Sequence, residues 1–406
     1  MNHKILFFIK IIISNFLIIA FLGIYHPAVF GMNLDTYGNL YFEIANRDVN
    51  ESFESANPEL SGDLWTYTTG DFFIQGSEDD SLLQFLIDYK FEGNLQDSNH
   101  TSPTGYFNQY YIIVPFNFTS FLYCGQKYKR VGVAKFFNIS NRYERAGYPI
   151  KLIEYDILKS DNFNYGFIAN FKGAGQWEQV QYSGFVDCNK NNFNMQGYYF
   201  HEGTRGYSVA TDLTYQAGSI QLYGEALYMS QAHQKVAKLN SADPTGEGDI
   251  LDYRDQDSAT KIVAGIMVNQ DNYSIALEYM KNNEAYTAEE SEDFIRYLAR
   301  HPGWHQPYID YFSYNWAQNY LGLSLYLPRF GSDECSLTSS LIGSVPDEGI
   351  ESDYASYRGY VNIAYNIYQN LTANFSITHH FGGEKGEYLN LYEDKTRYQM
   401  SFLFSF

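Results

Sequence analysis

Apolar and polar residues alternate in several stretches of the chain. In the stretch 83–91, apolar or aromatic residues occupy every second position, and Gln84, Asp88 and Lys90 stand between them. The same period of two recurs in three further stretches, 220–228, 273–279 and 398–406. This period is typical of a β-strand with one apolar face and one face that tolerates water. The chain is therefore expected to be rich in such strands.

Sixteen segments with this pattern can be placed along the chain. They lie at 36–44, 65–75, 82–91, 109–115, 120–126, 150–156, 164–171, 206–215, 219–229, 260–269, 273–280, 309–316, 320–327, 357–366, 371–379 and 397–406. Hairpin turns are predicted at three places, near 76–80, 270–272 and 368–370. Eight long polar stretches lie between the hairpins, at 45–64, 92–108, 127–149, 172–205, 230–259, 281–308, 328–356 and 380–396.

This alternation of short and long links is typical of a transmembrane β-barrel. A barrel is also the sheet that survives in lipid, because its closure leaves no unpaired strand edge. The sequence therefore predicts an all-β fold. We expect a 16-stranded antiparallel transmembrane β-barrel with short periplasmic turns and long extracellular loops.

A secreted soluble β-sandwich or adhesin is the alternative reading of the same alternation, with the apolar face packed in a dry core. Three features favour the barrel. Tyr and Phe are abundant at strand ends, as an interfacial girdle requires. The last strand ends on Phe406. The polar face also carries charges that a dry core would rarely accept, among them Asp88, Lys90, Glu225 and Glu278.

The amino-terminal residues 1–31 have the pattern of a secretory signal. Lys4 and Lys10 give a positive start, and a largely apolar run follows up to Pro27. We expect cleavage after Gly31, which leaves 32–406 as the barrel domain. The alternative is an uncleaved anchor helix, since the apolar run is roughly long enough to span a bilayer.

Composition narrows the class of protein further. The 406 residues include 39 Tyr and 31 Phe, and the formal net charge is −20. A chain this acidic is not expected to bind nucleic acid through a basic face. Its large apolar residues argue against disorder. Three cysteines, Cys124, Cys188 and Cys335, are too few for a disulfide scaffold, and their redox state stays open.

Several short motifs follow one another in the same order as in a known family. They are Tyr37-Gly38-Asn39-Leu40-Tyr41, Phe73-Ile74-Gln75-Gly76-Ser77-Glu78-Asp79, the run at 116–126, and Glu154-Tyr155-Asp156 with Asp161-Asn162-Phe163 and Gly166-Phe167. They resemble the "YGK", "GFKGSED", "FGTLTLGRQ" and "RYDSPNFSGF" motifs of the general trimeric Gram-negative porins. The resemblance implies a 16-stranded barrel, a homotrimer and passive diffusion of small hydrophilic solutes. It also implies that Phe406 is the signal read by the barrel-assembly machinery.

In that family the third long loop folds into the pore, carries carboxylates and faces basic residues on the wall. Here the stretch 127–149 is the candidate pore-constricting loop, and both sides depart from the pattern. Asn39, Asp71 and Gln126 stand at the basic wall positions. The loop carries six bases against one acid: Lys127, Lys129, Arg130, Lys135, Arg142 and Arg145 against Glu144. The polarity of the constriction is therefore expected to be partly reversed. The alternative is that these bases lie on the flanks of the loop and face headgroups or the trimer interface.

Two long stretches, 230–259 and 328–356, are rich in acid. They form either a solvated surface, a vestibule that attracts cations, or carboxylates bridged by divalent ions to lipopolysaccharide and other outer-membrane lipid. No arrangement of catalytic residues is recognisable. His301 and His305 flank Pro302-Gly303 and make a poor metal pair, so neither a metal nor a cofactor is expected.

Four functions remain to be compared. The first is a non-specific porin, and the second is a substrate-selective channel for sugars or phosphate on the same fold. The third is an enzymatic barrel, which the absence of a recognisable catalytic set disfavours. The fourth is a secreted adhesin.

Overall fold

The structure is a computed structural model. It describes residues 32–49, 64–78, 84–94, 104–117, 119–129, 131–139, 150–160, 162–171, 180–201, 206–231, 235–240, 248–253, 258–301, 316–345, 352–391 and 394–405. The predicted signal at 1–31 and the terminal Phe406 lie outside these residues. Among the residues described, no helix has both the length and the apolar character needed to cross a membrane.

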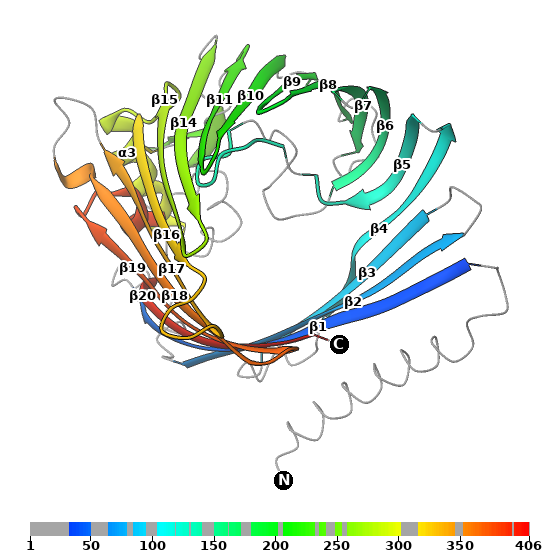
Figure 1. Cartoon of the computed structure of the whole chain (residues 1–406). Coiled ribbons are helices and arrows are strands. Elements are labelled where there is room, and N and C mark those ends of the chain that lie inside the picture. Colours follow the sequence, from blue (N-terminus) through cyan, green and yellow to red (C-terminus); the bar gives the residue numbers. More distant parts are fainter. Residues whose placement is uncertain are drawn as a thin grey trace.

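Eighteen strands pair antiparallel in a single sheet. They are β1 (Met32–Val49), β2 (Leu64–Glu78), β3 (Gln84–Asn94), β4 (Thr104–Asn117), β5 (Ser120–Lys127), β6 (Ile150–Ser160), β7 (Phe163–Phe171), β8 (Val180–Lys190), β9 (Phe193–His201), β10 (Tyr207–Ala217), β11 (Ile220–Met229), β14 (Ala259–Gln270), β15 (Tyr273–Asn282), β16 (Asn319–Leu327), β17 (Cys335–Val345), β18 (Ser356–Tyr368), β19 (Leu371–Gly382) and β20 (Asp394–Ser405). Neighbours in this order pair with one another, and β1 also pairs with β20. The sheet is therefore a closed barrel (Figure 1).

The predicted count of sixteen strands is wrong. Strands β8, β9 and β17 lie in stretches that the sequence assigned to long loops. The predicted strand at 309–316 falls almost wholly outside the described residues, and Trp316 is not in a strand. Among these three, β17 is poor in the large apolar residues that mark the other strands. Strand β17 reads Cys-Ser-Leu-Thr-Ser-Ser-Leu-Ile-Gly-Ser-Val, so its small polar residues hide the alternation.

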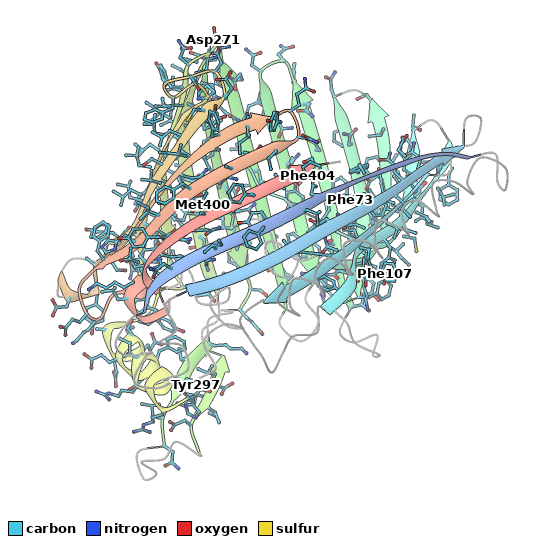
Figure 2. All side chains as sticks on the ribbon, turned by 90° about the horizontal axis from the view of Figure 1, so that it is seen from below. Phe73, Phe107, Asp271, Tyr297, Met400 and Phe404 are labelled. Atoms are coloured by element: carbon cyan, nitrogen blue, oxygen red, sulfur yellow. The ribbon has the colours of Figure 1, made fainter. Side chains whose placement is uncertain are left out.

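The apolar face of the barrel points outward. On β15, Ile275 and Leu277 are 40% and 43% exposed. Glu278, which stands between Leu277 and Tyr279, is fully buried. The same outer face carries Met400 and Phe404 on β20, which Figure 2 labels. An apolar outside and a polar inside match the demands of a bilayer around a wet interior. The closed barrel also excludes the sandwich as an explanation of the alternation.

Short turns lie at one end of the barrel. The pairs Asn191–Asn192, Gly218–Ser219, Asp271–Asn272 and Gln369–Asn370 each join two strands. The hairpins predicted near 270–272 and 368–370 are thus confirmed. For the third, near 76–80, β2 runs on to Glu78, and the rest lies outside the described residues.

Longer connections lie at the other end and hold structure of their own. They contain the small hairpin β12 (Lys235–Lys238) and β13 (Ile250–Tyr253), helix α3 (Ala288–Arg300), the turn η4 (Ser352–Tyr354) and helix α5 (Glu387–Leu391). Helix α3 begins with a capping box, in which Glu290 N–H donates to Thr287 Oγ1 and Thr287 N–H donates to Glu290 Oε2. Figure 2 shows α3 with Tyr297 beyond the ends of the strands.

These outer connections pack on each other as one cluster. Its apolar centre contains Ala237, Tyr286, Phe294, Tyr297 and Trp316. Part of the predicted acidic surface is paired here with bases. Asp249 contacts Arg300 at 3.2 Å, and Asp252 contacts Lys238 at 2.6 Å.

Candidate functional site

The segment 131–139, which follows β5, lies inside the barrel. In Figure 1 it appears as the teal trace that leaves β5 and runs toward β11 and β14. Val131, Ala134 and Phe137 are buried in the main apolar cluster of the barrel. The ring of Phe137 packs against Tyr320 of β16, with 5.8 Å between the ring centroids.

Glu278 of β15 holds the middle of this segment. Its carboxylate accepts hydrogen bonds from the backbone N–H groups of Lys135, Phe136 and Phe137, at 2.7, 3.1 and 2.7 Å. The hydroxyl of Tyr223 on β11 donates a fourth, at 3.0 Å. A fully buried carboxylate is tolerated only when such donors replace the water that it has lost.

Glu225 of β11 holds the residues on either side of 135–137 in the same way. Its Oε1 accepts from the N–H groups of Val133 and Ala134, both at 2.6 Å, and its Oε2 accepts from Ile139 N–H at 2.9 Å. Six backbone donors of an irregular segment are thus satisfied by two wall carboxylates. Successive N–H groups that converge in this way form a natural site for an anion.

Two glycines make this close approach possible. Gly132 has a φ of +98°, and a Cβ there would lie 2.6 Å from Glu225 Oε1. On the wall, a Cβ at Gly322 of β16 would collide with the ring of Phe136. The segment therefore rests on the wall because side-chain atoms are missing from both surfaces.

The predicted bases at the start of the loop bind a wall carboxylate. Lys127 Nζ lies 2.5 Å from Glu154 of β6, and Lys129 contacts the other oxygen of the same carboxylate. Lys127 Nζ also lies 3.8 Å from the centroid of the Tyr123 ring. Glu154 is fully buried, and its single charge offsets one of the two positive charges of these lysines at close range. Lys135 differs, since its side chain is exposed.

Two of the predicted wall residues are brought together. Asn39 of β1 lies directly opposite Asp71 of β2, and Asp71 lies opposite Lys90 of β3. Asn39 Oδ1 also accepts a hydrogen bond from Ser405 Oγ at 2.8 Å. Leu40, the next residue on β1, pairs with the outward Phe404, which places Asn39 and Asp71 on the inner face.

Gln126 does not join this group. It pairs with Lys151 of β6, while the next residue, Lys127, pairs with the buried Ile150. Successive residues of a strand face opposite sides of a sheet, so Gln126 lies on the face opposite to Lys127. Its side-chain amide donates to the backbone oxygens of Phe107 and Asn108, at 3.3 and 2.9 Å.

The remaining loop candidates, Arg130, Arg142, Glu144 and Arg145, lie outside the described residues. Sequence reasoning did not assign Glu154, Glu225 and Glu278 to this site. The alternation of polar and apolar residues predicts that these side chains lie on the polar face. It does not predict that they bind a loop distant in sequence. The three cysteines are unpaired. Within the described ranges, no three His, Cys, Asp or Glu residues are placed to hold a metal ion.

The fold is similar to that of several solved bacterial proteins. Acinetobacter baumannii OccAB1 is 10% identical with a TM-score of 0.60, covering 92% of this chain and 96% of that one. Pseudomonas aeruginosa OccK3 (OpdO) is 9% identical with a TM-score of 0.57, covering 92% and 96%. Pseudomonas aeruginosa OccD3 (OpdP) is 11% identical with a TM-score of 0.57, covering 93% and 92%.

At such low identity the likeness establishes the fold alone, and this chain shares with these structures a closed antiparallel β-barrel. In sequence, the chain matches no protein-family model and no curated protein.

Proposed function

We propose that this chain is a porin of the bacterial outer membrane, a water-filled channel for passive diffusion of ions and small hydrophilic solutes. One observation carries the proposal. The closed barrel of eighteen strands is apolar on its outside and carries charged side chains on its inside, with a loop segment folded into its interior. Such a barrel provides a polar path through lipid, and no catalytic step is needed for diffusion.

The constriction of this channel is assigned to the loop 127–149. The contacts of its described part with Glu225 and Glu278 support this assignment, because they hold the loop away from the outer end of the barrel. The narrow zone lies between this loop and the inner wall that carries Asn39 and Asp71. Glu154 offsets Lys127 and Lys129, so we expect a smaller reversal of polarity than the six bases suggest. Lys135, with Arg130, Arg142 and Arg145 against Glu144, then makes the main positive contribution.

A substrate-selective channel is the second candidate function. The close packing of the segment 131–139 on the wall favours it, since a shaped constriction can discriminate between solutes. One of the similar structures, Pseudomonas aeruginosa OpdK, was solved with vanillate. For the present chain the candidate solutes include sugars and phosphate.

Export and assembly complete the proposal. Residues 1–31 are assigned as a cleavable signal, and Phe406 as the signal for the barrel-assembly machinery. The turns between strands face the periplasm and the structured connections face outward. A homotrimer is proposed on the resemblance to the general porins. The acidic outer connections are proposed to meet lipopolysaccharide through divalent cations.

Planar-bilayer recording of the purified protein tests the function. We expect discrete conductance steps in symmetric KCl that scale with salt concentration. A salt gradient then gives the ion preference from the reversal potential. If a correctly folded, heat-modifiable barrel inserts and no conductance appears, the channel proposal is wrong.

A further inference from the structure

The inner faces of β1 and β2 carry a stacked pair of aromatic rings. Tyr37 of β1 and Phe73 of β2 are direct cross-strand partners. Their ring centroids lie 4.8 Å apart and their planes differ by 13°. Tyr37 is two residues from Asn39 and shares its inner face, and it is 41% exposed. An aromatic stack exposed to a wet interior offers both an apolar surface and an electron-rich ring face.

Carboxylates surround this stack on the same face. Asp35 and Asp71 each lie two residues from a ring on its own strand, and Asp88 of β3 lies directly opposite Phe73. Asp88 itself is buried, and its carboxylate accepts a hydrogen bond from Asn108 Nδ2 at 2.6 Å. Lys90, opposite Asp71, is the one base among these neighbouring positions. The site therefore combines the carboxylates of Asp35 and Asp71 with one ammonium group around an aromatic surface.

We propose that this aromatic and acidic wall of β1, β2 and β3 is a binding site for organic ammonium ions that pass through the channel. The inference rests on the proposed channel function and names a class of solute for it. An alkylammonium ion is attracted to an aromatic face by the ring quadrupole and to nearby carboxylates by its charge. An organic anion meets the like charges of Asp35 and Asp71 here. An uncharged solute gains only the contact with the rings.

Choline chloride is the probe, with 3,3-dimethylbutanol as its uncharged isostere and glucose as a sugar. Each is added to one side of a bilayer that holds the wild-type channel in symmetric KCl. We expect choline to reduce the potassium current in a saturable way, and the two uncharged solutes to leave it unchanged at equal concentration.

Two sets of variants assign the block to this site. Tyr37→Leu with Phe73→Leu removes the rings, and Asp35→Asn with Asp71→Asn removes charge and keeps the rings. Each set is expected to raise the half-blocking concentration of choline about tenfold, which corresponds to the usual strength of such contacts. Tyr360→Leu, an inner-face change on β18, is the matched control and is expected to keep the wild-type block.

The outcomes separate the site from the channel. Normal KCl conductance without a choline block overturns the site and leaves the channel intact. An equal block of wild type and both variant sets places choline elsewhere, and also overturns the site. A block by glucose or 3,3-dimethylbutanol that matches that of choline overturns the ammonium class. Absence of KCl conductance from a folded barrel overturns the channel, and with it this site.

Discussion

Two regions of the inner wall use acidic residues in opposite ways. On β11 and β15, Glu225 and Glu278 are buried, and the carboxylates accept six backbone N–H groups. On β1 and β2, Asp35 is exposed and Asp71 is half-buried beside an exposed aromatic stack. The same alternation of strand residues places all four on the inner face. Within the described residues, the segment 131–139 covers Glu225 and Glu278, whose carboxylates position its backbone, whereas Asp35 and Asp71 belong to the wall that we propose binds solutes.

The strongest test removes the covered carboxylates. Glu225→Ala with Glu278→Ala removes the acceptors of six N–H groups, of which those of Ala134, Phe137 and Ile139 are buried, at a cost of about 1–3 kcal/mol for each buried unsatisfied group. We expect the segment 131–139 to leave the wall. Single-channel conductance should rise, and trypsin should cut after Lys135 in the variant only.

Asp187→Asn is the control for that pair. Asp187 is an inner-face carboxylate of β8 that accepts a hydrogen bond from Asn194. Its change should leave conductance and cleavage as in the wild type. An unchanged conductance in the double Glu variant would show that the segment does not limit the pore.

Gly132→Ala is expected to have a smaller effect of the same kind. The new Cβ would lie 2.6 Å from Glu225 Oε1, in a backbone conformation that strains other residues by about 1–3 kcal/mol. Conductance noise should rise, because the carboxylate can no longer approach its donors. Gly218→Ala has a similar positive φ, with nothing within 4 Å of the new atom. Equal noise in both variants would assign the effect to backbone strain alone.

Lys135→Met tests the charge of the covered region. Loss of this exposed ammonium group should shift the reversal potential in a salt gradient toward cations. The effect of one charge should be modest, and it should shrink as salt screens the interior. Lys151→Met is the control, because Lys151 is exposed and its register pairs it with Gln126 on the outer face. An equal shift in both variants would refute a role for Lys135 in the pore.

The smallest expected effect concerns the outer connections. Hydrogen bonds from Lys385 and Tyr354 hold the pKa of the Glu292 carboxyl below its ordinary value of 4.5. A lowered pKa stabilises the folded state above the ordinary value, and this contribution is lost as the pH falls through the lower one. Lys385→Met should therefore speed hydrogen exchange in α3 at neutral pH.

That difference from the wild type should shrink below the ordinary pKa of Glu292 and disappear once the pH is below the lowered pKa of the folded state. Lys190→Met is the control. Lys190 ends β8 beside the turn Asn191–Asn192, at the end of the barrel away from α3, so hydrogen exchange in α3 should be unchanged. A difference that persists in acid would assign the effect of Lys385 to packing instead of charge.

Much of the barrel was predictable because its strands carry large alternating side chains. Strands β14 and β15 and their turn at Asp271–Asn272 were predicted within a few residues. Strand β17 was missed because Ser and Thr replace the apolar residues that mark a strand. The wall positions of Glu225 and Glu278 were likewise predictable. Their contacts were not predictable. The two carboxylates bind backbone N–H groups about ninety to one hundred and forty positions away, and a pattern of side chains carries no information on backbone N–H groups.

Gln126 shows the limit of an argument from motif position. The motif placed it among wall residues that line the pore. Its pairing with Lys151 places it on the other face of the sheet. A motif match gives the position of a residue along the chain. The face of the sheet on which its side chain lies depends on the strand register.

The way in which the wall holds the segment 131–139 also bears on protein engineering. Glu225 and Glu278 bind main-chain groups, which every amino acid except proline possesses. The hydrogen-bond acceptors that position this loop thus lie on the barrel wall, and the loop itself contributes Gly132 and the buried side chains of Ala134 and Phe137. A library that varies the exposed position 135 without proline would therefore present many different side chains to the lumen from one unchanged backbone path.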